Sequence, residues 1–476
     1  MSEIDYDRII STFRFKPEPS NVDIEISSSS DKSRVIFSSS FRRLQQKAQV
    51  FGLETNASVR SRLTHTLEVA NTGGLIAKNV ASVLIKKELL KENLRVPFID
   101  LTETCCLLHD IGNPPFGHFG ESAIQKWFSL YWKGIFRKSQ KITSKDHIKD
   151  ILAKSWMNDF LHFDGNPQGV RIALSLQDIP DQYTGNGLNL SFSQILSSVK
   201  YIGYPDEINK NDDKYKKAGY FHSERVKIET IRERLDWDHR FPITFIMEAA
   251  DDISYCLSDI EDGIEKGIIT SELFFNELNK TDLTAFDMKI DLKKCNSRFD
   301  FFKFKIEITR KLIKRASQSY VDNQDAIRKG TINDLFDNDV DAKMMLKSLK
   351  TFARTYLFRS KEAENIELAG YRIIFGLLEC YRPLLELTPE NFQYLIEAQN
   401  DINILPGKKL DIEWRLFNKL PEKHIDAYHY DVGKLVGDNK LLLEWYYRAH
   451  LIVDYISGMT DNFALETFRL LNGITI

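Results

Sequence analysis

The stretch ITFIMEAADDISYCLSDIEDGI, residues 243–264, carries the clearest structural pattern in the chain. Its apolar residues recur at spacings of four, three, four and three, in the series Ile246, Ala250, Ile253, Leu257 and Ile260. This period places them on one face of an α-helix. We therefore expect a long, buried helix from about residue 243 to residue 264.

Two further helices are predicted on the N-terminal side of that stretch. One runs from about Arg62 to Leu90 and the other from about Ile99 to His109, and both have apolar residues three and four apart. The polar run at 27–33, Ser-Ser-Ser-Ser-Asp-Lys-Ser, is typical of a loop. Alternation of apolar and polar residues is confined to short pieces such as residues 188–192. The predicted fold class is all-α, with minor short β hairpins.

The composition excludes several classes of protein. Hydrophobic residues make up 42% of the 476 residues and charged residues 28%, as in globular proteins. No run of about 18 apolar residues is present, so no membrane span is expected. The acidic start lacks the features of a signal peptide, so we expect a cytoplasmic protein. The net charge of −3 means that an anionic substrate must meet a local cluster of cations or a metal.

A His-Asp pair ends the second predicted helix. His109 and Asp110 are followed by Gly112 and two prolines, which stop a helix. An imidazole and a carboxylate at a helix end can both reach one metal ion, although the dipeptide alone is equally typical of a capping Asp beside a surface His. Asp251 borders the buried face described above, where a carboxylate needs a cationic partner. Asp252, about 100° further round the helix, is expected to contact solvent, or to contact a metal ligand rather than the metal itself.

The order of His65, His109-Asp110 and Asp251 resembles the motif of the HD superfamily of metal phosphohydrolases. By itself His65, on an otherwise apolar helical face, is more typical of a core residue. Five longer segments are similar to motifs of the bacterial dGTP triphosphohydrolases: residues 40–51, 58–69, 109–121, 248–255 and 454–461. The chain departs from that family at Ala48, where Thr is usual, and residues 262–440 match nothing recognisable.

The resemblance implies an HD-domain fold and hydrolysis of dGTP to deoxyguanosine and tripolyphosphate by attack of water at the α-phosphate. His65, His109, Asp110 and Asp251 would hold a divalent metal, Mn²⁺ or Mg²⁺ first, although Fe²⁺, Co²⁺ and Ni²⁺ suit the same ligand types. His118 would act in catalysis, oriented by Glu121 three residues later. The predicted substrate contacts are Arg43, Gln46, Gln49, Arg62, Asn166, Lys200, Tyr201, Lys217, Tyr255 and Asp259.

The same resemblance suggests how the chain is organised. We expect a partly flexible N-terminal arm (1–33), an HD catalytic core (34–265) with an inserted subdomain at about 130–235, and a C-terminal helical region (266–476) that completes the pocket and makes oligomer contacts. A hexamer or a dimer-based homo-oligomer is implied, with a nucleotide or single-stranded DNA effector. Three alternatives stay open: a broad-specificity dNTP triphosphohydrolase, another HD phosphohydrolase, and a nucleotide-regulated single-strand DNA binder.

Overall fold

The computed structural model describes residues 3–18, 22–142, 155–177, 184–281, 283, 286, 288, 291–399, 401, 404–405, 407–437 and 439–474. Helices are the regular structure of this part of the chain, and no strand occurs in it. Its one β-type pairing is an isolated antiparallel bridge between Ala48 and Ser61. The all-α fold class is confirmed, whereas the expected short β hairpins do not occur within the described ranges.

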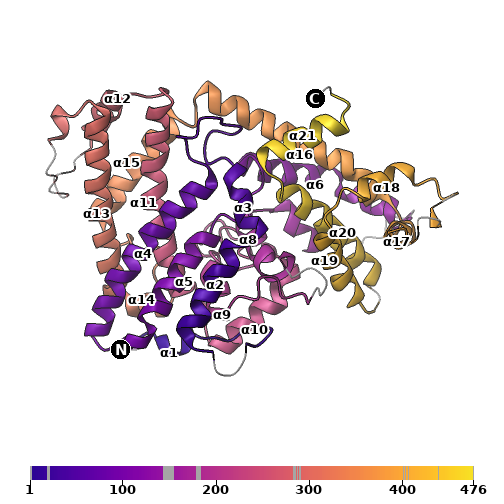
Figure 1. Ribbon diagram of the computed structural model, residues 1–476, viewed down its shortest axis with the longest axis horizontal. Coiled ribbons are helices and arrows are strands. Elements are labelled where there is room, and N and C mark those ends of the chain that lie inside the picture. The colour runs from indigo at the N-terminus through magenta and orange to yellow at the C-terminus, as the bar shows by residue number, and fades with distance from the viewer. Residues whose placement is uncertain are drawn as a thin grey trace.

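The three helices predicted around the candidate metal ligands are all present. They are α4 (Arg62–Lys86), α5 (Arg95–Leu108) and α11 (Pro242–Glu265). Ser61 begins α4 with a capping box that includes Thr64, and a proline begins α11, where its missing N–H costs nothing. The apolar face predicted for residues 243–264 is buried, and α4 packs against both α5 and α11 (Figure 1).

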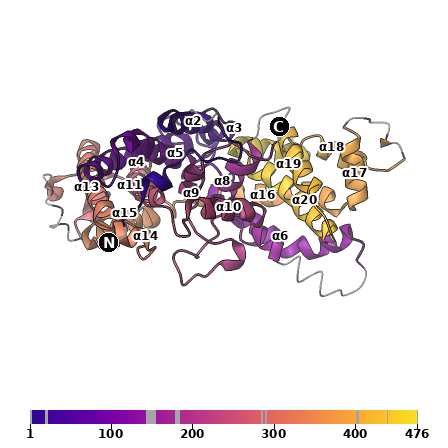
Figure 2. The same cartoon turned by 90° about the horizontal axis from the view of Figure 1, so that it is seen from below.

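The remaining helices lie before, between and after these three in the chain. On the N-terminal side they are α2 (Ile24–Ile36), α6 (Gly117–Ser139) and α10 (Arg225–Leu235), with the short α1 (Tyr6–Ile9), α3 (Ser39–Arg43), α8 (Gly165–Arg171) and α9 (Phe192–Ser198). On the C-terminal side they are α12 (Ser271–Leu278), α13 (Arg298–Asp322), α14 (Gln324–Arg328), α15 (Val340–Tyr356), α16 (Lys361–Glu386), α17 (Pro389–Glu397), α18 (Asp411–Phe417), α19 (Glu422–Gly433), α20 (Lys440–Ser457) and α21 (Asp461–Leu471). Figures 1 and 2 show α12, α13 and α15 at one end of an elongated molecule and α17 and α18 at the other.

Buried apolar side chains form two clusters. The first joins α4, α5, α9, α10, α11, α13 and α15, and the second joins α6, α16, α17 and α20. Because α5 belongs to the first cluster and α6 to the second, the loop between them, residues 109–116, passes from one to the other. This loop contains the His-Asp pair. The predicted domain boundaries at residues 33 and 265 remain predictions.

The prediction of a loop at residues 27–33 is wrong, because these residues lie inside α2. Asp23 caps the helix by accepting the Glu25 N–H at 2.8 Å. Ser27 and Asp31 are buried, and both bind the Arg14 guanidinium, which donates to Ser27 Oγ at 2.6 Å. A polar run therefore forms a helix because its buried side chains have a cationic partner elsewhere in the chain.

The piece at residues 188–192 is also not a strand. Asn189 has a left-handed backbone, with φ of 47°, which breaks an extended conformation. Ser191 then caps α9 by accepting the Gln194 N–H at 3.2 Å. The segment is thus the lead into a helix.

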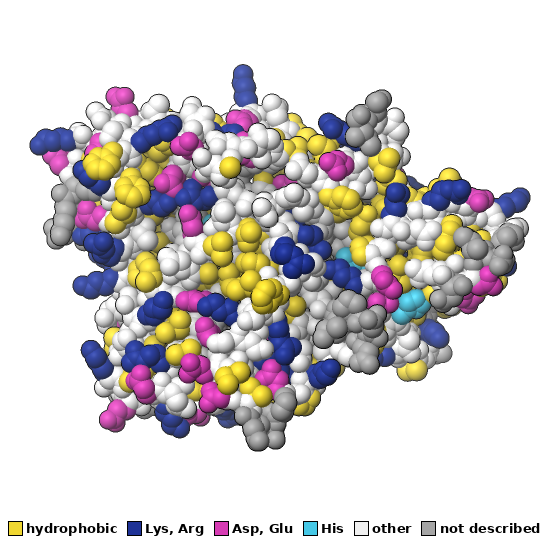
Figure 3. All heavy atoms as spheres, in the orientation of Figure 1, with side chains coloured by type: hydrophobic (Ala, Val, Ile, Leu, Met, Phe, Trp, Pro, Cys, Tyr) yellow, Lys and Arg dark blue, Asp and Glu magenta, His cyan; other side chains and the backbone are white. Residues whose placement is uncertain are grey.

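On the outside of the molecule, charges of both signs are interspersed. Lys and Arg side chains lie among Asp and Glu side chains over the left half of the face in Figure 3. No helix within the described ranges is long and apolar enough to cross a bilayer.

Candidate active site

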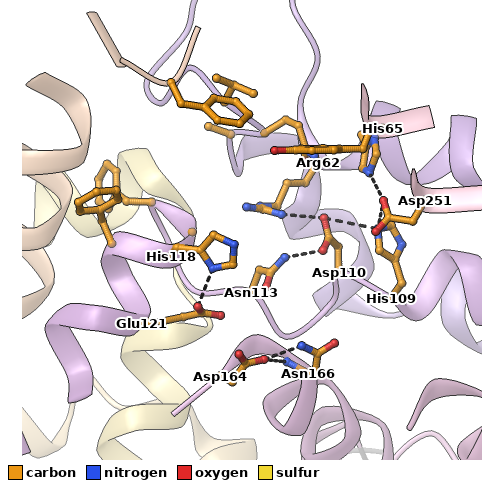
Figure 4. Close-up of a pocket in the computed structure, with 18 of the residues that line it drawn as sticks. Arg62, His65, His109, Asp110, Asn113, His118, Glu121, Asp164, Asn166 and Asp251 are labelled. Carbon is orange, nitrogen blue, oxygen red and sulfur yellow. Dashed lines mark hydrogen bonds and ion pairs between the residues drawn. The ribbon is translucent and has the colours of Figure 1, made fainter. Parts of the chain in front are cut away.

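His65, His109, Asp110 and Asp251 converge from α4, the end of α5 and α11 (Figure 4). One donor atom from each of His65, His109 and Asp110 lies within 4.8 Å of the others. Asp251 Oδ1 lies 3.1 Å from His65 Nε2 and 3.7 Å from His109 Nε2. Ligands that each lie about 2.0–2.2 Å from one ion are separated by such distances, so His65, His109 and Asp110 form one compact group and Asp251 adjoins its two histidines. Together these four residues are the candidate metal-ligand cluster.

His109 shows that this cluster is suited to a cation. Its Nδ1 lies 2.7 Å from the carbonyl oxygen of Cys106, which can only accept, so Nδ1 is a donor and Nε2 is the nitrogen that faces the site. Nε2 is buried, has no hydrogen-bond partner within the described part of the chain, and lies 3.6 Å from Asp110 Oδ2. A metal ion bound to Nε2 and to the carboxylates would satisfy this buried nitrogen.

Asp110 is held in place by two neighbouring side chains. Arg62 Nη1 donates to its Oδ2 at 2.6 Å, and Asn113 Nδ2 donates to its Oδ1 at 2.5 Å. Burial by itself would raise the pKa of the Asp110 carboxyl, but the nearby His109 and Arg62 outweigh burial and lower the pKa. Asp110 is therefore an oriented carboxylate rather than a neutral acid.

His118 and Glu121 form a second pair on the first turn of α6. His118 Nδ1 lies 2.7 Å from Glu121 Oε2, and Glu121 Oε1 accepts the N–H of Gly165 at 2.8 Å. Glu121 is buried, whereas the His118 side chain is 83% exposed. The hydrogen bond to Glu121 raises the pKa of His118. Because Nδ1 donates to the carboxylate, Nε2 is the nitrogen left free for proton transfer.

A cavity of about 500 Å³ joins the metal-ligand cluster to this pair. In Figure 4 His118 and Glu121 lie on one side of it and the metal-ligand cluster on the other. Four cationic side chains line the cavity: Arg62, Lys200, Lys217 and Lys350. Six carboxylates line it as well: Asp110, Glu121, Asp164, Asp251, Asp252 and Glu367. The carboxylates of the lining thus outnumber its lysine and arginine side chains by two, and a bound divalent cation would offset this difference.

The structure places seven of the ten predicted substrate contacts on the cavity wall: Gln49, Arg62, Asn166, Lys200, Tyr201, Lys217 and Tyr255. The other three do not line it. Arg43 donates to Ser40 Oγ at 2.9 Å and Gln46 accepts from Thr460 at 3.5 Å. Asp259 is fully buried on α11, and burial raises its pKa to about 8, so its carboxyl is neutral at pH 7.

Several cavity residues were missed at the sequence level. Lys350 on α15 pairs with Asp252 at 2.8 Å, and Phe358 and Glu367 come from the segment that matched nothing recognisable. Asp252, expected to contact solvent or a metal ligand, lies on the cavity wall with its side chain 42% exposed. No local pattern could have found Lys350, because only the packing of α15 on α11 brings it to the site.

Residues 62–155 match the HD domain family. The matched range contains His65, the His109-Asp110 pair and the His118–Glu121 pair, and Asp251 lies beyond it. An HD domain supports membership of the HD superfamily and an activity as a metal-dependent hydrolase, in agreement with the geometry of the cluster.

Proposed function

We propose that the protein hydrolyses dGTP to deoxyguanosine and tripolyphosphate in a metal-dependent reaction. The observation that carries this proposal is the single cavity lined by a metal-ligand cluster, an exposed His–Glu pair and four cationic side chains. A divalent ion held by His65, His109, Asp110 and Asp251 would neutralise phosphate charge and lower the pKa of a water molecule.

Two of the four cations, Lys200 and Lys217, are suited to a triphosphate because each is paired with a carboxylate that is not one of the proposed metal ligands. Lys217 Nζ lies 2.5 Å from Asp164 Oδ2, and Lys200 Nζ lies 3.4 Å from Glu248 Oε1. Both cations keep part of their side chains exposed to the cavity. An entering phosphate chain would replace these partners with its own oxygens, and the cations would fix its position along the cavity.

In the proposed reaction water attacks the α-phosphorus and the bond from phosphorus to the 5′ oxygen breaks. The leaving 5′ oxygen is a strongly basic alkoxide unless it receives a proton. Protonated His118 is the residue placed to supply this proton from Nε2, because Glu121 holds Nδ1 and keeps the ring charged to higher pH. Deoxyguanosine and tripolyphosphate are then the two products.

Guanine specificity is the finer part of the proposal, and it rests on the sequence resemblance together with Gln49. This residue lines the cavity, and its Oε1 is buried without a hydrogen-bond partner within the described ranges. An unpaired amide oxygen is costly unless a ligand donates to it, so Gln49 is suited to a base or sugar donor. Tyr255, also on the cavity wall, offers a ring beside the sugar.

The test is a panel of deoxynucleoside and ribonucleoside triphosphates incubated with the purified protein and Mn²⁺, with the products separated by chromatography. We expect tripolyphosphate from dGTP and no turnover by the His109→Ala and Asp110→Ala variants. Equal rates for all four dNTPs would replace dGTP specificity with broad specificity. Release of pyrophosphate or inorganic phosphate, or turnover that survives chelation, would overturn the proposal.

A further inference from the structure

The turn between α20 and α21, residues 458–460, lies next to the candidate active site but contributes no residue to the cavity wall. Asp461 follows this turn as the first residue of α21 and is 2% exposed. Its carboxylate binds two backbone N–H groups from distant parts of the chain. Oδ2 accepts from Ala48 at 2.9 Å, and Oδ1 accepts from Phe116 at 3.0 Å. One side chain thereby joins the turn to the loop that precedes α6.

Lys47 makes a second connection between the same segments. Its ammonium group is buried and donates to two backbone carbonyls, those of Asn113 and Ser457, the latter at 3.0 Å. The backbone carbonyl of Lys47 accepts the N–H of Arg62 at 2.9 Å, at the start of α4. Lys47 therefore links Asn113, three residues before Phe116, to the end of α20 and to the start of α4.

Phe116 has a backbone conformation that needs such support. It is left-handed, with φ of 60° and ψ of 21°, a conformation that bulky side chains rarely adopt. Its ring packs against Gly370 of α16 so closely that a Cβ on Gly370 would lie 2.4 Å from the ring. The bend at Phe116 sets the direction in which α6 starts, and His118 is two residues further along.

We propose that Asp461 is a positioning residue for His118. By fixing the N–H of Phe116, the Asp461 carboxylate holds the left-handed bend and so sets the position of the His118 ring relative to Asp110. Asp461 itself does not line the cavity, but the two backbone N–H groups that it binds belong to cavity-lining residues, Phe116 and Ala48. Of these two contacts, the one to Phe116 leads to His118. The kinetic part of this proposal rests on the proposed function, whereas the anchoring of the loop does not.

The anchoring is tested by hydrogen–deuterium exchange of the Asp461→Ala and Asp461→Asn variants. Asp337→Ala is a matched control, because Asp337 Oδ2 also accepts two backbone N–H groups, from Asn333 at 2.7 Å and Asp334 at 3.1 Å, away from the cavity. We expect exchange at residues 116–120 to rise about tenfold or more in Asp461→Ala, less in Asp461→Asn, and not at all in the control. The affinity for Mn²⁺ should stay within about threefold of wild type. Unchanged exchange in Asp461→Ala would overturn the proposal.

The positioning of His118 is tested by a double-mutant cycle on hydrolysis. A misplaced catalytic group costs about 100-fold in kcat, so we expect that loss in Asp461→Ala with KM within about threefold of wild type. The double variant Asp461→Ala/His118→Ala should be no slower than His118→Ala, since the two residues act as one unit. Additive losses would overturn the positioning role. If the wild-type protein hydrolysed no nucleotide, the proposed function would fail, and the exchange experiment would still decide whether Asp461 anchors the loop.

Discussion

His118 and Glu121 combine an exposed imidazole with a buried carboxylate that is itself fixed by the N–H of Gly165. The His118 ring is accessible to a substrate, whereas the Glu121 carboxylate is held in a fixed position beside the ring. This asymmetry is what a proton donor needs, because the ring must meet the leaving group in one orientation and must be protonated when it does.

The pH dependence of kcat should depend on this pair. Since Glu121 raises the pKa of His118, the fraction of protonated ring, and with it kcat, falls as the pH rises through that raised value. Glu121→Gln removes the charge that raises the pKa, so the descent of kcat should begin at lower pH and the maximal kcat should fall about tenfold or more. The measurement is kcat against pH at saturating Mn²⁺ and dGTP. A descent at the same pH in Glu121→Gln would contradict the assigned roles.

Among single residues, the site residues that could be predicted from the sequence are those that belong to a recognisable sequence pattern. His109 and Asp110 are adjacent in the chain, and Asp251 follows a regular apolar face, so all three could be located before the structure was available. Lys350 and Glu367 could not be located, because each is an ordinary charged residue on an amphipathic helix. Arg43 and Gln46 were expected at the cavity and are not there, because Arg43 donates to Ser40 and Gln46 accepts from Thr460, whereas this segment reaches the cavity wall only from Ala48 onward.

Among the elements, α8 and α20 are joined by a buried ion-pair network. The Arg171 guanidinium lies 2.8 Å from Asp454 Oδ2 and 3.0 Å from Glu224 Oε1, with all three side chains almost completely buried. Gln168 also donates to Asp454 at 2.9 Å. This network fixes α8, whose first turn carries Asn166 on the cavity wall.

Asp454→Ala should therefore destabilise the fold strongly. Removing one partner of a buried ion pair costs about 3–5 kcal/mol in the free energy of unfolding. Arg171 would lose one of its two buried carboxylate partners and keep Glu224. Urea denaturation followed by circular dichroism measures this loss. Glu229→Ala is the control, because it breaks the exposed Arg225–Glu229 pair at 2.7 Å and should cost at most about 1 kcal/mol. A loss of less than about 1 kcal/mol in Asp454→Ala would contradict the role given to the network.

Helix prediction succeeded and failed for physical reasons that differ between elements. The helices α4, α5 and α11 were predictable because each buries one apolar face against the others. The polar helix α2 was not, because Ser27 and Asp31 are stabilised by Arg14, which lies in a different segment. The local composition of residues 27–33 predicts a loop, and only the tertiary contact with Arg14 explains why they form a helix.

For the whole molecule, the central feature is that the site lies between two hydrophobic clusters. The metal-ligand cluster belongs to helices of the first, and the His118–Glu121 pair belongs to α6 of the second. Binding of metal and phosphate at this junction would hold the two parts together. The sequence could not predict this division, because the C-terminal helices contribute to both clusters without any change in composition.

A metal bound to the native state alone should raise the melting temperature of the protein. At a free Mn²⁺ concentration of 100 times Kd the gain is about 2.7 kcal/mol. Differential scanning fluorimetry with increasing Mn²⁺, and again after chelation, measures the shift. His109→Ala should lose most of it, whereas the remote Glu229→Ala variant should keep it. An equal shift in His109→Ala would place the stabilising metal elsewhere.

The proposed attack of water at the α-phosphorus in a metal-dependent reaction can be followed by hydrolysis of dGTP in ¹⁸O-labelled water with Mn²⁺. Phosphorus NMR and mass spectrometry then locate the label in the products. We expect one ¹⁸O in a terminal phosphate of tripolyphosphate and none in deoxyguanosine, with no reaction by Asp110→Ala. Label in deoxyguanosine, in pyrophosphate or in inorganic phosphate would contradict this proposal.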